Sequence, residues 1–273
     1  CGFRRHHHLK RSTACHAACG RRHQRKTLYA LSHVNVLARG WGIPNVYLKD
    51  AEKILAPYIG KRISLNAAEN QYQVALAKND NPSASNKPNA IKLPSINTSD
   101  LKLRDLRSLR QADHVYCGSK AANLGQINAN IKTANVPDGF CIPFGYYQQF
   151  LQQLGIDSQY LQHMEASFKG NNRARRAGLL ALQEKIQTAP VPQAWQDAWG
   201  AQWQNQLQGL GVFVRSSSNS EDLPNFSGAG LYTTVPNVKS KQALSEAVKQ
   251  SWASVFNYSA YEARRIAGLP HDS

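Results

Sequence analysis

Residues 214–230 read VRSSSNSEDLPNFSGAG, and the interpretation of the whole chain starts from this stretch. The β-branched and aromatic residues Val212–Val214 predict a strand that ends at Arg215. An arginine there can hold two phosphate oxygens at once. The small residues that follow let backbone N–H groups approach a phosphate chain without Cβ clashes. Both features indicate a nucleotide site. Glu221 and Asp222 are open to two interpretations, bracing the loop through backbone hydrogen bonds or direct catalysis.

A second segment, GSKAANL at residues 118–124, places Lys120 on the first turn of a predicted helix. Ser119 is expected to cap this helix, which runs through Ile127. By itself Lys120 is weak evidence, because most such lysines are solvated surface charges. The sequence VPDGF at residues 136–140 begins an extended segment bounded by prolines.

A third segment, residues 31–46, reads LSHVNVLARGWGIPNV. A lone histidine is usually structural. His33, however, precedes an apolar helix predicted at Val34–Arg39, where free N–H groups and the helix dipole would stabilise a phosphate on its ring. Imidazole is also a competent nucleophile near neutral pH. The pattern therefore makes His33 a candidate phosphate carrier.

Together the three segments resemble the superfamily of phosphoenolpyruvate synthase, pyruvate phosphate dikinase and glucan, water dikinase. Its motifs are Ser-His with Ala-Arg and Gly-Ile-Pro, then Gly-Lys-x-x-Asn-Leu, Val-Pro-x-Gly-Phe, Val-Arg-Ser-Ser and Glu-Asp-Leu-Pro with a glycine-rich loop. The resemblance implies that His33 is the phosphorylated residue and that Arg39 lies near the phosphate. It also implies an ATP-binding set, with the loop over the phosphates: Lys120, Arg215, Ser227, Gly228, Ala229 and Gly230. Upstream of His33, Thr27–Ala30 replaces the Gly- and Thr-rich lead-in of the family.

The resemblance implies a two-stage phosphotransferase reaction that uses ATP and Mg²⁺. His33 would attack the β-phosphate, release AMP, and later pass the phosphate to an acceptor; the metal would bridge phosphate oxygens. Pyruvate and a glucan are the two acceptor candidates. The histidine segment comes first, as in glucan, water dikinase, whereas Lys120–Leu124 looks closer to the synthase.

The resemblance also implies the fold class, which is α/β. A small phosphohistidine swivel domain is expected at residues 31–77, and the N-terminal part of an α+β ATP-grasp domain at 113–273. Residues 1–30 are interpreted as a basic leader, disordered or misread, and 78–112 as a flexible linker whose most polar part is Lys78–Thr98. Because the chain opens at Cys1 and ends at Ser273, before the family's acidic metal-binding strand, it is expected to be a truncated piece and inactive alone.

Local patterns predict the elements of each domain. In the first, a strand at Ile43–Leu48 is followed by a short helix from a cap at Asp50 to Leu55 and by a hairpin with residues 63 and 65 facing 72, 74 and 76. In the second, helices are expected near residues 146–154, 173–187, 192–207 and 242–266. The last helix has apolar residues at helical spacing, which indicate a core face: Leu244, Val248, Trp252, Val255 and Phe256.

The formal charge of +16 raises a nucleic-acid alternative. Eight basic residues lie in residues 1–26 and no acidic residue precedes Asp50, so half of the excess lies in the leader. Without an aromatic-interleaved motif this alternative is weak. A non-catalytic ATP-binding or interaction fragment is the stronger one.

The cysteines and the apolar runs bear on metal binding and location. Cys15 and Cys19 with His16 and His23 fit no zinc spacing well, so no metal site is expected. No sequence logic pairs Cys117 with Cys141, so both are expected to be reduced in a cytoplasmic protein. No apolar run approaches the roughly 20 residues that span a bilayer, so no membrane partner is expected.

Overall fold

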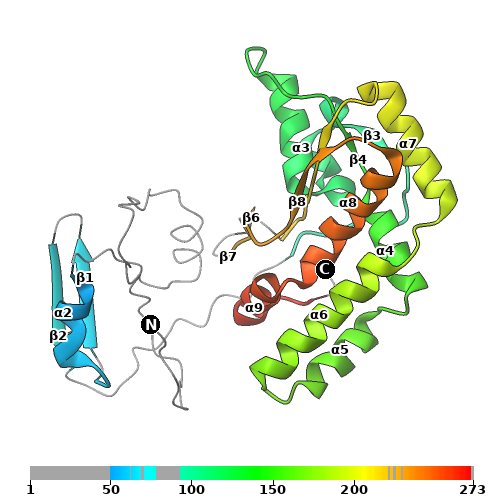
Figure 1. Ribbon diagram of the computed structural model, residues 1–273. Coiled ribbons are helices and arrows are strands. Elements are labelled where there is room, and N and C mark those ends of the chain that lie inside the picture. The colour runs from blue at the N-terminus through cyan, green and yellow to red at the C-terminus, as the bar shows by residue number, and fades with distance from the viewer. Residues whose placement is uncertain are drawn as a thin grey trace. The chain divides into compact units, whose positions relative to one another are not determined.

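The computed structural model describes residues 50–61, 63–68, 71–77, 93–220, 222–223, 226–228 and 230–271. The chain divides into two compact units, with the boundary between Asn89 and Ala90 (Figure 1). His33, Arg39 and Ala229 lie outside the described residues, as do the predicted helix at 34–39 and strand at 43–48.

The described part of the first unit is a short helical segment followed by a hairpin. Helix α2 (Ala51–Leu55) continues into the 3-10 turn η1 (Ala56–Tyr58), and strands β1 (Ile63–Ala68) and β2 (Gln71–Leu76) pair antiparallel. Residue 63 lies opposite 76 and residue 65 opposite 74, which confirms the predicted hairpin. The predicted cap at Asp50 is wrong, because this residue adopts φ 57° and its side chain makes no capping hydrogen bond.

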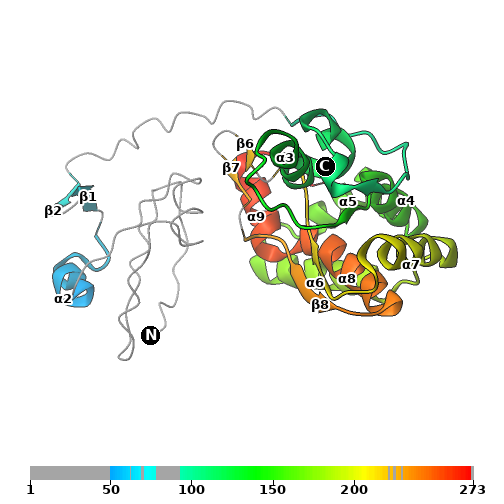
Figure 2. The same cartoon turned by 90° about the horizontal axis from the view of Figure 1, so that it is seen from above.

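The core of the second unit is built by helices that pack around α8 (Lys241–Ala253). Helix α8 contacts α6 (Asn172–Thr188), α7 (Gln193–Leu207) and the strand β8 (Thr234–Val238), as Figures 1 and 2 show. Helices α4 (Phe144–Gln153) and α5 (Ser158–Ser167) complete the layer. The predicted helices near 146–154, 173–187 and 192–207 are thus confirmed, whereas α5 was not predicted.

The predicted helix at 242–266 is wrong as a single element. Helix α8 ends in the 3-10 turn η4 (Ser254–Phe256), and a new helix, α9 (Tyr258–Ala267), follows Asn257, whose extended ψ of 139° breaks the helical path. The predicted core face is nevertheless found, with Leu244, Val248 and Phe256 buried and Trp252 and Val255 packed against them.

Within the described part of the second unit, the strands form three antiparallel pairs. Strand β3 (Arg104–Asp105) pairs with β4 (Phe140–Cys141), β5 (Val212–Arg215) with β8, and β6 (Asp222–Leu223) with β7 (Phe226–Ser227). Along β5 the side chains alternate: Val212 and Val214 pack against the core, and Phe213 and Arg215 are exposed. The strand therefore directs Arg215 away from the core.

Residues 93–112, assigned above to the flexible linker, are instead packed on the second unit. They include β3 and the turns η2 (Leu106–Ser108) and η3 (Gln111–Asp113), and Leu109 is 1% exposed. The Arg107 guanidinium donates two hydrogen bonds to the carbonyl oxygen of Val136, at 3.1 and 2.8 Å. Because residues 78–98 are mostly polar, their composition gave no sign that the apolar residues after them pack on the second unit. No helix within the described ranges is long and apolar enough to cross a membrane.

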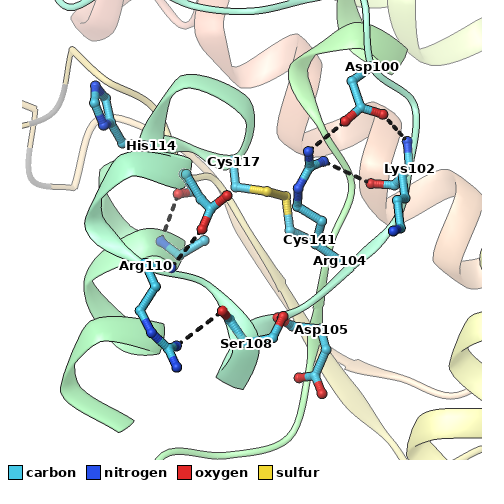
Figure 3. Close-up of a disulfide and its surroundings, with 12 residues drawn as sticks. Asp100, Lys102, Arg104, Asp105, Ser108, Arg110, His114, Cys117 and Cys141 are labelled. Atoms are coloured by element: carbon cyan, nitrogen blue, oxygen red, sulfur yellow. Dashed lines mark hydrogen bonds and ion pairs between the residues drawn. A yellow bond between two sulfur atoms is a disulfide. The ribbon is translucent and has the colours of Figure 1, made fainter. Parts of the chain in front are cut away.

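The expectation that Cys117 and Cys141 are reduced is wrong. The two residues form a disulfide, with their Cα atoms 5.9 Å apart, between the first turn of α3 (His114–Asn130) and β4 (Figure 3). The side chains are only 3% and 7% exposed. The disulfide therefore fixes the residue just before Gly118 to the strand beside it.

Candidate nucleotide-binding site

The helix that carries Lys120 begins at a glycine that no other residue could replace without strain. Gly118 has φ 76° and ψ 165°, which interrupts α3, so the regular helix starts anew at Ser119. A Cβ at Gly118 would overlap the carbonyl oxygen of Ser217. Glycine thus permits the backbone of residues 216–218 to lie directly against the start of the helix.

The serine-rich loop after β5 (residues 216–220) satisfies the free polar groups at this helix start. The Ser217 hydroxyl oxygen accepts a hydrogen bond from the backbone N–H of Ala121 at 3.0 Å. Asn219, which is 7% exposed, accepts from the Ser119 hydroxyl at 3.3 Å and donates to the His114 carbonyl at 3.0 Å. The prediction that Ser119 caps the helix is therefore wrong. The capping oxygen comes from Ser217, which lies 96 positions after Ala121, the residue whose N–H it accepts.

This packing brings the segments of Lys120 and Arg215 together. Lys120 lies two residues after Gly118 and Arg215 two residues before Ser217, and both side chains are exposed. The Arg215 guanidinium carbon lies 5.5 Å from the centre of the Phe213 ring, a cation–π contact along the exposed face of β5. A lysine at a helix start and an arginine on the strand whose loop packs against that start are residue types suited to binding a polyanion.

The glycine-rich loop (residues 227–230) follows the β6–β7 hairpin. Ser227 lies opposite Asp222 in this hairpin, and Gly228 is buried, with its carbonyl accepting from the Leu231 N–H at 3.1 Å. Gly230 is exposed and has φ 75°, a conformation that favours glycine. Figure 1 shows the hairpin near α9.

Sequence reasoning missed Asn219 and the disulfide. Asn219 could have been singled out as the only amide among four serines in residues 216–220. The cysteines gave no local signal, since 24 positions separate them.

A charged cluster supports the disulfide from the other side. The Arg104 guanidinium lies 4.1 Å from the centre of the Tyr116 ring and 2.5 Å from Asp100, as Figure 3 shows for the ion pair. The Lys102 N–H and then the Arg104 guanidinium hold the pKa of Asp100 below its usual value. Tyr116, the residue before Cys117, is thus packed against the Arg104 guanidinium, and Asp100 holds that guanidinium in place.

Comparison with known proteins places this geometry in a family. The model described as pyruvate phosphate dikinase, AMP/ATP-binding domain, matches residues 115–273, more than half of the chain. The chain belongs to this family. The resemblance inferred from the motifs is confirmed.

Relatives of the dikinase ATP-binding family carry two activity names. A rifampicin phosphotransferase from Streptomyces sp is 27% identical over 167 residues, covering 61% of this chain and 19% of that protein. Phosphoenolpyruvate synthase is 34% identical in Synechocystis sp. over 56% of this chain and 20% of that protein, and 31% identical in Escherichia coli with the same coverage. The matched region thus spans about a fifth of each relative's length.

The dikinase ATP-binding match begins at Val115, the second residue of α3, so it contains Gly118, Lys120, β5, the serine-rich loop and the glycine-rich loop. The segment around His33 lies outside it. Among the described residues no three His, Cys, Asp or Glu side chains gather as a metal site. The side chains of Glu221 and Asp222 are not among those described.

Proposed function

We propose that this chain takes part in ATP-dependent phosphoryl transfer of the dikinase type. In this proposal ATP binds beside the start of α3, and His33 attacks the β-phosphate, which releases AMP and leaves the β- and γ-phosphates on the imidazole. Water then removes the γ-phosphate as inorganic phosphate, and the β-phosphate that stays on His33 passes to an acceptor. The observation that carries the proposal is the contact of Gly118 with Ser217, which brings the segments of Lys120 and Arg215 together within a family described as AMP/ATP-binding.

Each residue has a distinct role in this proposal. Arg215 holds two phosphate oxygens through its planar guanidinium, and Lys120 adds a point charge at the helix N-terminus. Ser227, Gly228, Ala229 and Gly230 cover the phosphates with backbone N–H groups. Mg²⁺ would arrive with the nucleotide and neutralise oxygens that two cations cannot. Arg39 would stabilise the phosphate on His33.

The acceptor stays a proposal with two candidates, pyruvate and a glucan. One relative is named for rifampicin and the other for phosphoenolpyruvate, and the matched region is about a fifth of the length of each. The ATP-binding region that they share with this chain therefore does not specify the acceptor.

Isotope labelling tests the dikinase reaction. In the full-length protein, ATP labelled at the β-phosphate is expected to leave acid-labile, base-stable label, whereas γ-label does not persist. His33→Ala is expected to abolish labelling, and His163→Ala, at an exposed position on α5, to leave it unchanged. Undiminished β-label on the His33 variant would show that another residue is the carrier.

One observation favours a second function, which is ATP binding without catalysis. The family match covers residues 115–273 and leaves out the segment around His33. In that case ATP binds and neither isotope labels the chain, so the same experiment separates the two functions.

A further inference from the structure

The chain leaving the glycine-rich loop is held at three consecutive residues, two by the α8–α9 corner, defined here as residues 254–257, and one by Arg264 of α9. The Leu231 carbonyl accepts from the Asn257 side-chain amide at 3.2 Å. The Thr233 N–H donates to the Ser254 hydroxyl oxygen at 3.0 Å. Between them, the Tyr232 hydroxyl receives a hydrogen bond from Arg264 of α9 at 3.3 Å. The exit of the loop is therefore tied to the helical core by side chains.

Arg264 is the most deeply buried member of this group, at 0% exposed. Its second terminal nitrogen donates to the carbonyl of Val255, within the α8–α9 corner, at 2.6 Å. The planar guanidinium thus connects the corner with the loop exit. Its rigid geometry fixes the directions in which the two terminal nitrogens donate. Burying a charge is costly unless its hydrogen bonds are kept, so the contact with Tyr232 is not easily given up.

The same network reaches the other side of the β6–β7 hairpin. The Tyr232 hydroxyl lies 3.5 Å from the hydroxyl of Ser220, the residue that enters the hairpin region. Ser220 is 4% exposed and is bonded through its N–H and its hydroxyl to the Ser218 hydroxyl, at 3.0 and 2.8 Å. Arg264 is therefore linked to both the entry and the exit of the segment that contains the glycine-rich loop.

We infer that Arg264 is a positioning residue for the nucleotide site. Through Tyr232 it fixes the height at which the backbone N–H groups of the glycine-rich loop meet the ATP phosphates. This inference rests on the proposed function for its ligand, but the placement of the loop by Arg264 can be measured without any ligand.

Amide hydrogen exchange of the peptide covering residues 226–234 tests the placement in the nucleotide-free chain. Arg264→Met and Tyr232→Phe are expected to speed exchange about 3- to 10-fold, the loss of one net hydrogen bond. Arg264→Lys is expected to restore part of the protection. The matched control is Arg175→Met, because Arg175 is also buried, at 7% exposed, and contacts Glu262 of the same helix at 3.0 Å without touching the loop.

If Arg264→Met fails to fold, Tyr232→Phe tests the inference by itself, because that substitution removes only one hydroxyl from a partly buried ring. Exchange that is unchanged in Tyr232→Phe, or that rises equally in the Arg175 control, would overturn the inference.

Nucleotide affinity then separates positioning from general destabilisation. A loop that covers the phosphates affects ATP more than AMP, so Tyr232→Phe and Arg264→Lys are expected to weaken ATP binding about 3- to 10-fold and AMP binding less than about 2-fold. Equal losses for ATP and AMP would indicate a structural role only. Absence of ATP binding by the parent chain would contradict the proposed function, while the exchange result would still stand or fall by itself.

Discussion

The start of α3 and the glycine-rich loop are the two halves of the proposed nucleotide site, and they are held in different ways. The start of α3 is fixed by close backbone contact at Gly118, by the capping oxygen of Ser217 and by the disulfide at Cys117. The glycine-rich loop is held at its ends, through single hydrogen bonds from the α8–α9 corner and Arg264. Changes to the contacts that fix the start of α3 are therefore expected to alter mainly stability, and changes to the hydrogen bonds that hold the glycine-rich loop mainly ligand affinity.

The largest effect is expected from Gly118→Ala. The new Cβ would overlap the Ser217 carbonyl, and φ 76° is unfavourable for alanine. Backbone strain and overpacking together are expected to lower the free energy of unfolding by about 4 kcal/mol. Urea denaturation measures this.

Gly155→Ala is the matched control for this substitution. Gly155 also has positive φ, 65°, but a Cβ there meets nothing within 4 Å. Only the strain is added, so a loss of about 1 kcal/mol is expected. Equal losses at the two glycines would show that the contact of Gly118 with Ser217 is not tight, and the difference between the two halves would disappear.

The second effect is that of the disulfide. Joining cysteines 24 positions apart restricts the unfolded chain, so removing the bond is expected to cost about 3 kcal/mol. The double variant Cys117→Ser/Cys141→Ser and the parent chain under a thiol reductant are expected to unfold at the same lowered urea concentration. Two results together would show that these cysteines are not joined. The stability of the parent chain would be the same with and without the reductant, and all of its thiols would react with a thiol reagent after unfolding without reductant.

The smallest effect concerns pH and the support behind the disulfide. The Lys102 N–H and Arg104 lower the pKa of Asp100, so ionised Asp100 stabilises the folded chain above its ordinary pKa of 3.8. This contribution is lost as the pH falls through the lowered folded-state pKa. Because the pair is partly exposed to solvent, Asp100→Asn is expected to cost only a few tenths of a kcal/mol at pH 7. The difference between variant and parent is expected to vanish in acid, as urea titrations at several pH values would show; a difference that persists there would indicate packing instead of charge.

Patterns within short segments predicted the fold well. The alternation of Ile63 and Leu65 against Val74 and Leu76 gave the hairpin in its observed register, and Val212–Val214 gave β5. In both cases the alternation lies within one strand or between two strands joined by a short turn, so the period of the pattern contains the information.

Contacts between distant segments could not be predicted in this way. The capping oxygen of α3 comes from Ser217 and the partner of Cys117 is Cys141, and neither is marked by local spacing. Helix α5 was missed because its sequence SQYLQHMEAS buries only Leu161. The break at Asn257 lies inside an uninterrupted helical pattern, and only the tertiary contact of that residue with Leu231 explains it.

The residues of the proposed site were recognised by motif, whereas their support was not. Lys120 and Arg215 stood out because their neighbours match a family pattern, and the family is confirmed. Arg264 and Tyr232 are common residue types at unremarkable positions, and only their hydrogen bonds connect them with the glycine-rich loop. A supporting residue of this kind is found from geometry alone.

The central claim is that the surface formed by the start of α3 and the end of β5 binds ATP, and calorimetric titration of the chain with ATP tests it most directly. Arg215→Ala loses two charge-assisted hydrogen bonds and is expected to weaken binding about 10-fold or more, Lys120→Ala to weaken it less, and Lys132→Ala, at an exposed position beyond α3, not at all. Equal affinities for the parent chain and all three variants would show that ATP binds elsewhere.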